Sequence, residues 1–537
     1  MIPEIKPEIT SEVPPESPQG DIPAVPPEPL QEVVPAIPPA VVPRNRWQRF
    51  LHWEFLGLAI IVLATLIFHI IAIDRPPTIV WDETWYVGDA RSIFSGTGEL
   101  RPEHPPLAKL FIVAGDYIFN GFNTPEKDSG AKTQGYIGND ATNDNVINVT
   151  DASKFNVGET IRIETEQLDI TGVNTTLNQI TVKRAVGGTT SWDHSGQQTI
   201  YIFTDNASGW RFFSIIFGTI GIILFYFICR KLKFSWKTTM LATFLFAFED
   251  MTFLHSGLAL LDVYMVTFML AALLAYLDEK YIWSGILVAL SAECKLVGVL
   301  IIIAILFHWI IYRRDKWKTF VVSLIVAAVS FVVLIVFFDF FIKGNIENPI
   351  TRINALLSST AANQFTVPKL SISSRPWVWI YPQWVNPVQN SPFIAYSYDP
   401  QYISFISSTI QLLIIPTIGY MIYKVTKGSK TAGLIILWFL ATYVIWIPLD
   451  IVSNRVTFVF YFLTTTPAIC IGIAMGLTEA LDFLKKRREK LNRLSTGVAI
   501  SYGAIGLYLL IHLAIFIVFN PAIPTIIKTW LPPFNVG

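Results

Sequence analysis

Charged residues are scarce in this chain of 537 residues. Asp, Glu, Lys and Arg together make up only 15% of it, whereas roughly a quarter is usual in a soluble domain. Apolar side chains make up 52%, and the mean hydropathy is positive. This composition excludes an ordinary soluble domain and predicts a protein that crosses the membrane many times. The formal net charge of zero argues against a nucleic-acid partner.

Cysteine is also rare. The three cysteines, Cys229, Cys294 and Cys470, all lie in or beside apolar runs, and none lies in a polar loop. A framework of disulfides is therefore not expected.

Proline, by contrast, is abundant in residues 1–43, where it is mixed with Glu and Val. Proline at this density excludes helices and paired strands, so we expect a disordered, partly polyproline tail on the cytoplasmic side. The segment has no charged start followed by a short apolar core, so we do not expect a cleavable signal peptide. Two interpretations of the tail stay open: a tether or docking segment, and a simple spacer.

Long apolar runs begin at Phe55–Ile73, which is long enough at 1.5 Å per residue to cross roughly 30 Å of hydrocarbon. Ten further runs follow, at about 212–229, 238–254, 258–277, 282–293, 296–312, 319–341, 403–423, 431–449, 456–476 and 498–519. Three arginines precede the first run, and basic clusters follow the second, sixth, eighth and tenth runs. Because cytoplasmic loops are rich in Lys and Arg, eleven spans place every cluster inside and the C-terminus outside.

The predicted fold is an all-α polytopic membrane protein with about 11 transmembrane helices and a small β insert in the first extracytoplasmic loop. Its predicted divisions are the tail at 1–43, the first span with the start of a catalytic loop at 44–123, the insert at 124–208, spans two to seven at 209–341, a second exterior loop at 342–402, and the remaining spans at 403–537.

The insert at 124–208 changes abruptly to Thr, Asn, Gly and Asp with alternating Ile and Val. Period-two patterns in TIRIET, QITVKR and QTIYIF, separated by Gly and Asn, predict a small antiparallel β module. The stretch from FNVGETIRIE to GGTTSWDHSG resembles a short β unit of phage-tail and surface proteins, which implies adhesion or simple packing. Asp193 and His194 are candidate metal ligands, but two residues alone make a weak motif.

Ionisable residues gather at one side of the predicted topology. The stretch 78-TIVWDETWYVGDARSI-93 follows the first span and carries the adjacent acids Asp82 and Glu83 among aromatic residues. Further charged or titratable groups at that side are Glu103, His104, Lys109, Arg211, Asp262, Lys295 and Arg455. Charge at the rim of a bilayer is costly and usually marks function. We expect a reaction or binding cleft at the outer membrane surface, with solvated loop acids as the alternative.

Several of these segments together resemble the membrane-embedded GT-C glycosyltransferases of the protein O-mannosyltransferase type, which use dolichyl- or polyprenyl-phosphate-mannose. The matching stretches are 81-WDETWYVGDA-90, 104-HPPLAK-109, 211-RFFSIIFGTIGIILFY-226, 260-LLDVYMVTFML-270, 287-LVALSAECKLVG-298 and 455-RVTFVFYFLTTTPA-468. The chain departs from the family at Gly257, where Arg is common, and at Leu296, where an aromatic residue is common. It also lacks a β-trefoil insertion in 342–402, which favours a prokaryotic relative and leaves the sugar and acceptor open.

The resemblance implies transfer of mannose from a polyprenyl-phosphate donor to a hydroxyl, with protein Ser or Thr as the expected acceptor. Such chemistry needs a carboxylate to take the acceptor proton, cations to hold the leaving phosphate, and an apolar groove for the prenyl chain. We expect Asp82 to be the base and Glu83 a supporting acid. Candidate phosphate ligands are Arg211, Lys295, His104 and Lys109, and candidate supporting residues are Asp262 and Arg455. Neither a metal nor a cofactor is expected.

Other roles for these side chains stay open. Arg211 could snorkel at the membrane edge, Lys295 could pair with Glu293, His104 could hold its turn, and Asp262 could brace its helix. The exterior stretch 375-RPWVWIYPQWVNP-387 is either a lid or an interfacial belt. Rival functions are a related transferase with a lipid or glycan acceptor, and a non-catalytic transporter or assembly protein. The expected location is a prokaryotic plasma membrane, with the site on the extracytoplasmic face.

Overall fold

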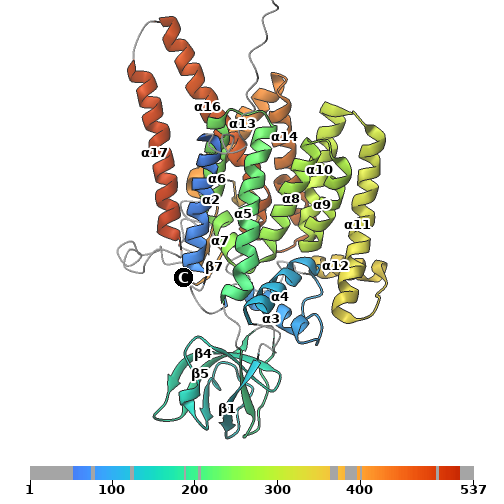
Figure 1. Cartoon of the computed structure of the whole chain (residues 1–537), viewed down its shortest axis with the longest axis vertical. Coiled ribbons are helices and arrows are strands. Elements are labelled where there is room, and N and C mark those ends of the chain that lie inside the picture. The colour runs from blue at the N-terminus through green and yellow to red at the C-terminus, as the bar shows by residue number, and fades with distance from the viewer. Residues whose placement is uncertain are drawn as a thin grey trace, which may run out of the picture. The chain divides into compact units, whose positions relative to one another are not determined.

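The computed structural model describes residues 53–73, 79–80, 82–120, 126–186, 189–203, 207–362, 373–380, 396–399, 402–491 and 495–520. The predicted proline-rich tail at 1–43 lies outside these residues. Most of the described chain is helical, and the long helices lie side by side (Figure 1).

Eight helical segments of the described residues are long and apolar enough to cross a membrane. These are α2 (Trp53–Ala72), α5 (Ala207–Lys231), Leu296–Arg313 (η2, α10 and η3), α11 (Trp317–Lys343), α13 (Ser408–Thr426), Lys430–Ser453 (α14, η5 and α15), most of α16 (Thr466–Leu491), and α17 (Ser495–Phe519). Several present an exposed apolar face, such as Ile325, Val329 and Val333 on α11. Such faces suit a lipid environment, in which apolar surface carries no cost.

The predicted count of eleven spans is not confirmed. The run at 238–254 breaks into α6 (Trp236–Ala247) and α7 (Asp250–Gly257), and α6 extends only about 18 Å at 1.5 Å per residue. α7 and α8 (Leu261–Leu277) are bent by 112° and make at most one further span together. α9 (Tyr281–Cys294) is apolar but short. The run looked continuous in the sequence because its break depends on a polar cap rather than on proline.

That cap is Glu249. Its Oε2 accepts hydrogen bonds from the backbone N–H and the hydroxyl of Thr252, both at 2.7 Å, and its Oε1 accepts from the N–H of Ser407 at 3.1 Å. A carboxylate at the N-cap satisfies backbone donors that a new helix leaves unpaired. α7 therefore begins at Asp250, inside what the hydropathy presents as one span.

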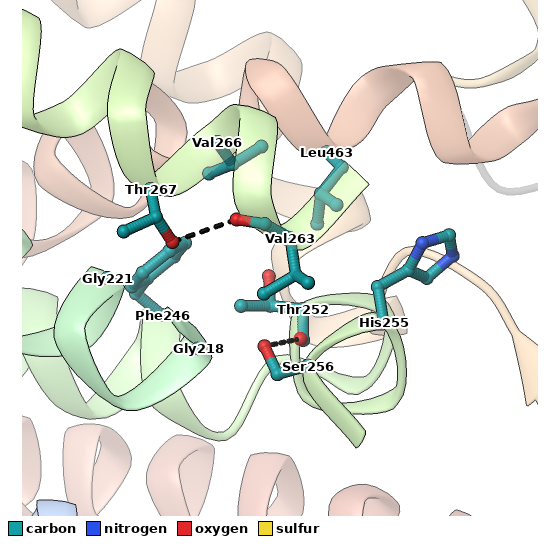
Figure 2. A pocket seen from close by; sticks show the side chains of 10 residues that line it. All are labelled: Gly218, Gly221, Phe246, Thr252, His255, Ser256, Val263, Val266, Thr267 and Leu463. Carbon is teal, nitrogen blue, oxygen red and sulfur yellow. Dashed lines mark hydrogen bonds between the residues drawn. The ribbon is translucent and has the colours of Figure 1, made fainter. Parts of the chain in front are cut away.

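Glycines bring α5 close to α7 and α8. A Cβ added at Gly218 would lie 2.4 Å from Cβ of Ser256, and one at Gly221 would lie 3.3 Å from Oγ1 of Thr267. Between these helices lies a small pocket with an empty volume of about 280 Å³. In Figure 2, Thr252, Ser256 and Val263 gather around this pocket, and the ring of His255 points away from them.

Replacing Gly218 by Ala is expected to destabilise the protein by about 1–3 kcal/mol, because the new methyl group overlaps Ser256 and forces α5 away from α7. Thermal unfolding in detergent or nanodiscs measures this as a lower melting temperature. The matched control is Gly419→Ala in α13, where no atom lies within 4 Å of the added Cβ. There the better helix propensity of Ala should leave stability unchanged or slightly raised. Equal melting of both variants would contradict the close packing.

Two short helices follow α2. These are α3 (Glu83–Phe94) and α4 (Leu107–Asn120), and α4 packs against both α3 and the start of α5 (Figure 1). α12 (Pro349–Ala362) follows α11 and carries Arg352, a buried residue whose contacts reach the loop between α3 and α4. The charged residues singled out in the sequence lie in or beside these elements.

The predicted β insert is present as a closed barrel of six antiparallel strands in the order β1-β2-β5-β4-β3-β6. The strands are β1 (Glu126–Gln134), β2 (Val146–Val149), β3 (Thr160–Ile163), β4 (Glu166–Asn174), β5 (Gln179–Val186) and β6 (Thr199–Phe203). Ile147, Ile161, Leu168, Ile180 and Ile200 form its core, and none of them is exposed. The barrel thus has a core of its own, as the alternating pattern in the sequence indicates.

A polar cluster is buried in the barrel. Arg184 donates to both oxygens of Glu166, and His194 lies between Glu166 (2.8 Å) and Glu164 (2.7 Å). Burial raises the pKa of the Glu166 carboxyl, but the bonds from His194 and Arg184 outweigh this effect and bring it to about 2. His194, a candidate metal ligand in the sequence, has both ring nitrogens bonded to carboxylates. The described residues contain no cluster of three or more His, Cys, Asp or Glu that could hold a metal ion.

Arg91 joins the barrel to α3. Its guanidinium lies 3.9 Å from the centroid of the Phe203 ring at the end of β6, and Nη1 lies 3.5 Å from Oε1 of Gln167 in β4. The arginine is only 4% exposed, so this contact is desolvated, where cation–π attraction is strongest. The helix that begins at the Asp82–Glu83 pair is thereby fixed to the insert.

Candidate active site

The two adjacent acids of the sequence have different environments. Glu83 has no exposed surface, and its oxygens accept from Nε (2.8 Å) and Nη2 (2.7 Å) of Arg211. The same carboxylate accepts from the backbone N–H of Val80 and, across the break between α7 and α8, from that of Ala259. Glu83 is therefore a junction between α3, α5 and the α7–α8 break, held by a bidentate ion pair.

Arg211 itself has no exposed surface, and its Nη1 donates to the carbonyl of Ile73 at 3.0 Å. Nε and Nη2 thus donate to Glu83, and Nη1 donates to a backbone carbonyl. This geometry disfavours the expectation that Arg211 holds the donor phosphate, and equally the alternative that it snorkels at the membrane edge. The sequence could not reveal this, because Glu83 lies 128 residues away.

Lys295 also forms a buried ion pair, with the carboxylate of Asp262. Its Nζ lies 2.9 Å from both oxygens of Asp262, and neither residue is more than 7% exposed. Asp262 is further 3.9 Å from Nδ1 of His255. Asp262 therefore pairs α8 with the turn after α9, as the brace interpretation expects, and it neutralises one candidate phosphate ligand.

Glu293 does not pair with Lys295. It is fully buried, and within the described part of the chain neither of its carboxyl oxygens has a hydrogen-bond partner. The alternative of a local Glu293–Lys295 pair is wrong, because Asp262, 33 residues away, takes the ammonium group.

Lys109 lies in a buried network of charges. Its Nζ is 2.9 Å from Oδ2 of Asp89 and also contacts Glu99, and none of the three side chains is exposed. Arg352 of α12 continues the network, with its Nη2 3.1 Å from Oε2 of Glu99 and its Nε 2.8 Å from Oδ2 of Asp339. Removing one member of such a network leaves a buried charge unpaired, at a cost of several kcal/mol. This arrangement favours the interpretation that Lys109 holds the loop in place.

The same network shapes the loop that carries His104. Lys109 Nζ donates to the carbonyl of Arg101 at 2.5 Å, and Arg352 donates to that of Pro102. The His104 ring lies edge-on to Tyr86 of α3, with 5.7 Å between the centroids. Burial and the positive charges of Lys295, Lys109 and Arg455 hold the pKa of His104 well below its ordinary value. His104 is therefore neutral at neutral pH and adds no positive charge to the site.

Tyr86 contacts His104 and lies within reach of the charges of Asp82 and Asp262. It is 4% exposed, and burial and the negative charges of Asp82 and Asp262 hold the pKa of its phenol well above its ordinary value. Asp82 is partly exposed at the N-cap of α3, with no cap hydrogen bond from its side chain. Its charge also acts on Lys295. Asp82 therefore belongs to the same electrostatic cluster as groups that lie about 180 and 210 residues away in the sequence.

Arg455 completes the cluster. It follows Asn454 at the end of α15 (Trp446–Ser453), is partly buried, and places its positive charge near His104. Across the described residues its guanidinium makes no hydrogen bond or ion pair, and its Nε is buried without a partner. Arg211, Lys295 and Lys109 are all paired with internal carboxylates. Arg455 is thus the predicted cation whose donors remain available to a ligand.

Aromatic rings line one side of this cluster. Nζ of Lys295 lies 5.0 Å from the centroid of Phe460 and 5.8 Å from that of Tyr461, both in η6 (Val459–Thr464). Phe458 and Phe460 stack with 5.2 Å between centroids. The stretches that contain Arg375 and the η6 rings are visible in the sequence, which gives these side chains no role in the cluster, and no motif marks Glu99, Asp339, Arg352 or Asp450. Only the buried position of a charge could have signalled them, and burial of single loop residues is not visible in a sequence.

The fold of the described residues is similar to that of a solved membrane protein. One solved relative is a chain of the S. cerevisiae protein O-mannosyltransferase Pmt1-Pmt2 complex bound to the sugar donor. The TM-score is 0.58 at 11% identity, over 88% of this chain and 90% of that one. At this identity the likeness concerns the fold.

The sequence model of the dolichyl-phosphate-mannose-protein mannosyltransferase family matches residues 185–346. This match confirms the resemblance seen in the sequence, and it contains Arg211, Asp262 and Lys295 but not Asp82, His104 or Arg455. Together with the fold it supports a membrane glycosyltransferase.

Weaker structural likenesses include the following two. The oligosaccharyltransferase of Archaeoglobus fulgidus has a TM-score of 0.49 at 12% identity, over 89% of this chain and 56% of that one. ArnT from Cupriavidus metallidurans, bound to undecaprenyl phosphate, has a TM-score of 0.46 at 11% identity, over 87% and 77%. Among curated proteins, none matches this chain by sequence.

Proposed function

We propose that this protein transfers mannose from a polyprenyl-phosphate donor to the hydroxyl of a protein Ser or Thr on the extracytoplasmic side of the membrane. The observation that carries the proposal is the pairing pattern of the cluster. Three of its cations are neutralised by internal carboxylates, whereas Arg455 keeps donors available in the electrostatic cluster to which the partly exposed acid Asp82 also belongs. A base and an unpaired cation in one place are what transfer from a phosphate donor requires.

In the proposed reaction, Asp82 takes the proton of the acceptor hydroxyl as its oxygen attacks the anomeric carbon of the sugar. The bond from that carbon to the phosphate oxygen breaks, and both of its electrons leave with the polyprenyl phosphate. One displacement inverts the configuration at the anomeric carbon. The leaving phosphate is a weak base, so it needs no protonating acid of the kind that glycosidases use.

Arg455 is proposed to hold the phosphate of the bound donor by charge-assisted hydrogen bonds. Glu83 and Arg211 fix α3 against α5 and so set the position of Asp82. The pair of Lys295 and Asp262 fixes the turn after α9 against α8, next to the aromatic rings of η6. The neutral His104 can accept or donate one hydrogen bond without competing for the phosphate as a cation.

The test uses the purified protein in nanodiscs with polyprenyl-phosphate-mannose and a peptide containing Ser and Thr. We expect labelled mannose on the peptide and none on a peptide in which Ala replaces every Ser and Thr. Transfer only to a lipid or glycan acceptor would move the assignment to a related transferase. No transfer to any acceptor would overturn the enzyme assignment in favour of a transporter or assembly protein.

Replacing Arg455 by Ala is expected to raise the KM for the donor by about 10- to 100-fold, because a hydrogen bond to a charged group contributes roughly 1.5–3 kcal/mol. Initial rates at varied donor concentration measure this, and the KM for the peptide should stay unchanged. The control is Lys316→Ala, since Lys316 lies exposed in a pair with Glu279 and away from the cluster. An unaltered donor KM in Arg455→Ala would remove Arg455 from the proposed site.

A further inference from the structure

The backbone before Arg455 has an unusual conformation. α15 ends at Ser453, and Asn454 then has a φ of +49°, a left-handed conformation that Asn tolerates better than most residues. Its N–H donates to the carbonyl of Asp450 at 2.8 Å. The direction in which Arg455 leaves the helix thus depends on how firmly this turn is held.

One side chain from another part of the chain holds the turn. Nη1 of Arg375 lies 2.9 Å from both oxygens of Asp450, and its Nη2 lies 2.8 Å from Oδ1 of Asn454. Asp450 is 1% exposed, so its carboxylate needs this partner. A single planar guanidinium therefore bridges the last turn of α15 and the left-handed residue that follows it.

The segment around Arg375 is itself fixed on the other side of Arg455. Ser374 donates its N–H to the carbonyl of Thr457 at 3.0 Å, and the Thr457 hydroxyl donates to the carbonyl of Ser374 at 2.7 Å. The hydroxyl of Tyr443 donates a hydrogen bond to the carbonyl of Pro376 at 3.0 Å. Residues 373–380 of the exterior loop thus hold the backbone both before and after Arg455.

Electrostatics explains why such a clamp is needed. Arg455 shares the surroundings of His104 with the positive charges of Lys295 and Lys109, and its guanidinium makes no ion pair within the described residues. Repulsion from like charges and the favourable hydration of a guanidinium both draw an unpaired arginine outward. Holding the backbone at two points opposes that movement while leaving the guanidinium available.

We propose that Arg375 is a positioning residue that holds Arg455 in place for the lipid phosphate of the donor. This inference rests on the proposed function and extends it to a residue of the exterior loop. Arg375 acts through Asp450 and Asn454, so it changes how well the phosphate is bound and not the proton transfer at Asp82.

The experiment compares Arg375→Lys, Arg375→Gln and the double variant Arg375→Gln/Asp450→Asn in nanodiscs. Arg375→Lys keeps the positive charge but loses the planar guanidinium that bridges Asp450 and Asn454. The double variant removes the charges of both Arg375 and Asp450, so that no buried carboxylate is left unpaired. We expect the donor KM to rise about tenfold in Arg375→Lys and in the double variant, with kcat and the peptide KM unchanged. Melting temperatures identify any variant that has simply unfolded, and Lys316→Ala is again the control.

A second arm tests whether the effect passes through Arg455. In an Arg455→Ala background, adding Arg375→Lys should produce no further rise in donor KM, since residues that act through one another are not additive. An unchanged donor KM in folded Arg375→Lys and in the folded double variant would overturn the inference. A full additional tenfold rise in the Arg455→Ala background would also overturn it.

Binding of polyprenyl phosphate itself separates this inference from the proposed function. If the unaltered protein binds this lipid but transfers no sugar, the proposed function fails, and the inference is decided by whether Arg375→Lys weakens binding about tenfold. If the unaltered protein does not bind the lipid, both fail.

Discussion

Asp82→Asn is expected to lower the rate of sugar transfer by about 10²- to 10⁴-fold, the usual contribution of a positioned base. The amide has nearly the shape of the carboxylate but takes no proton from the acceptor hydroxyl. Because Asp82 is partly exposed and Asn keeps its size, the fold should stay intact. The measurement is kcat for mannose transfer to a Ser/Thr peptide in nanodiscs, together with a melting temperature.

The control for this prediction is Asp151→Asn in the barrel, where the carboxylate accepts only local hydrogen bonds from Ser153 and should not affect transfer. A folded Asp82→Asn variant with unchanged kcat would remove Asp82 as the base. Loss of activity in both variants would mean that the assay reports stability and not chemistry.

Arg211→Ala is expected to act mainly on folding. It leaves the carboxylate of Glu83 buried without its ion-pair partner, and breaking such a pair costs about 3–5 kcal/mol. If Arg211 were a phosphate ligand, as expected from the sequence, donor use would suffer more than folding. The measurement is the melting temperature and the yield of folded protein.

A double variant separates the two roles of Arg211. Glu83→Gln/Arg211→Met removes both charges and keeps the volume of the pair, so it should recover much of the stability lost in Arg211→Ala. If it folds and transfers sugar with a nearly normal donor KM, Arg211 is structural. An Arg211→Ala variant that melts normally but has a greatly raised donor KM would restore the phosphate role and contradict the pairing described above.

Much of the architecture was visible in the sequence because it depends on local patterns. The apolar runs at Phe55–Ile73 and 319–341 correspond to α2 and α11, and the alternating residues at 124–208 form a β module. The break between α6 and α7 was missed because it depends on the carboxylate of Glu249, which caps α7 through Thr252 and also accepts from the N–H of Ser407, 158 residues away. Hydropathy averages over a window and does not detect a carboxylate that caps a helix inside an apolar run.

The candidate site was predictable as a set of residues but not as a set of roles. Asp82 and Glu83 are neighbours with the same chemistry, yet Glu83 has no exposed surface whereas Asp82 is partly exposed. A helix turns about 100° per residue, so adjacent side chains point to different surroundings. Arg352 carried no local signal at all, since its partner Glu99 is 253 residues away. Roles depend on such distant pairings, which a single sequence does not contain.

The closure of the inserted strands affects how a polypeptide can approach the enzyme. An open sheet presents a row of unpaired N–H and C=O groups to which an extended chain can add as a further strand. The six described strands pair in a ring, and β1 is bonded to both β2 and β6. An extended polypeptide therefore finds no unpaired strand edge among the described strands of this module, which disfavours aggregation by strand addition.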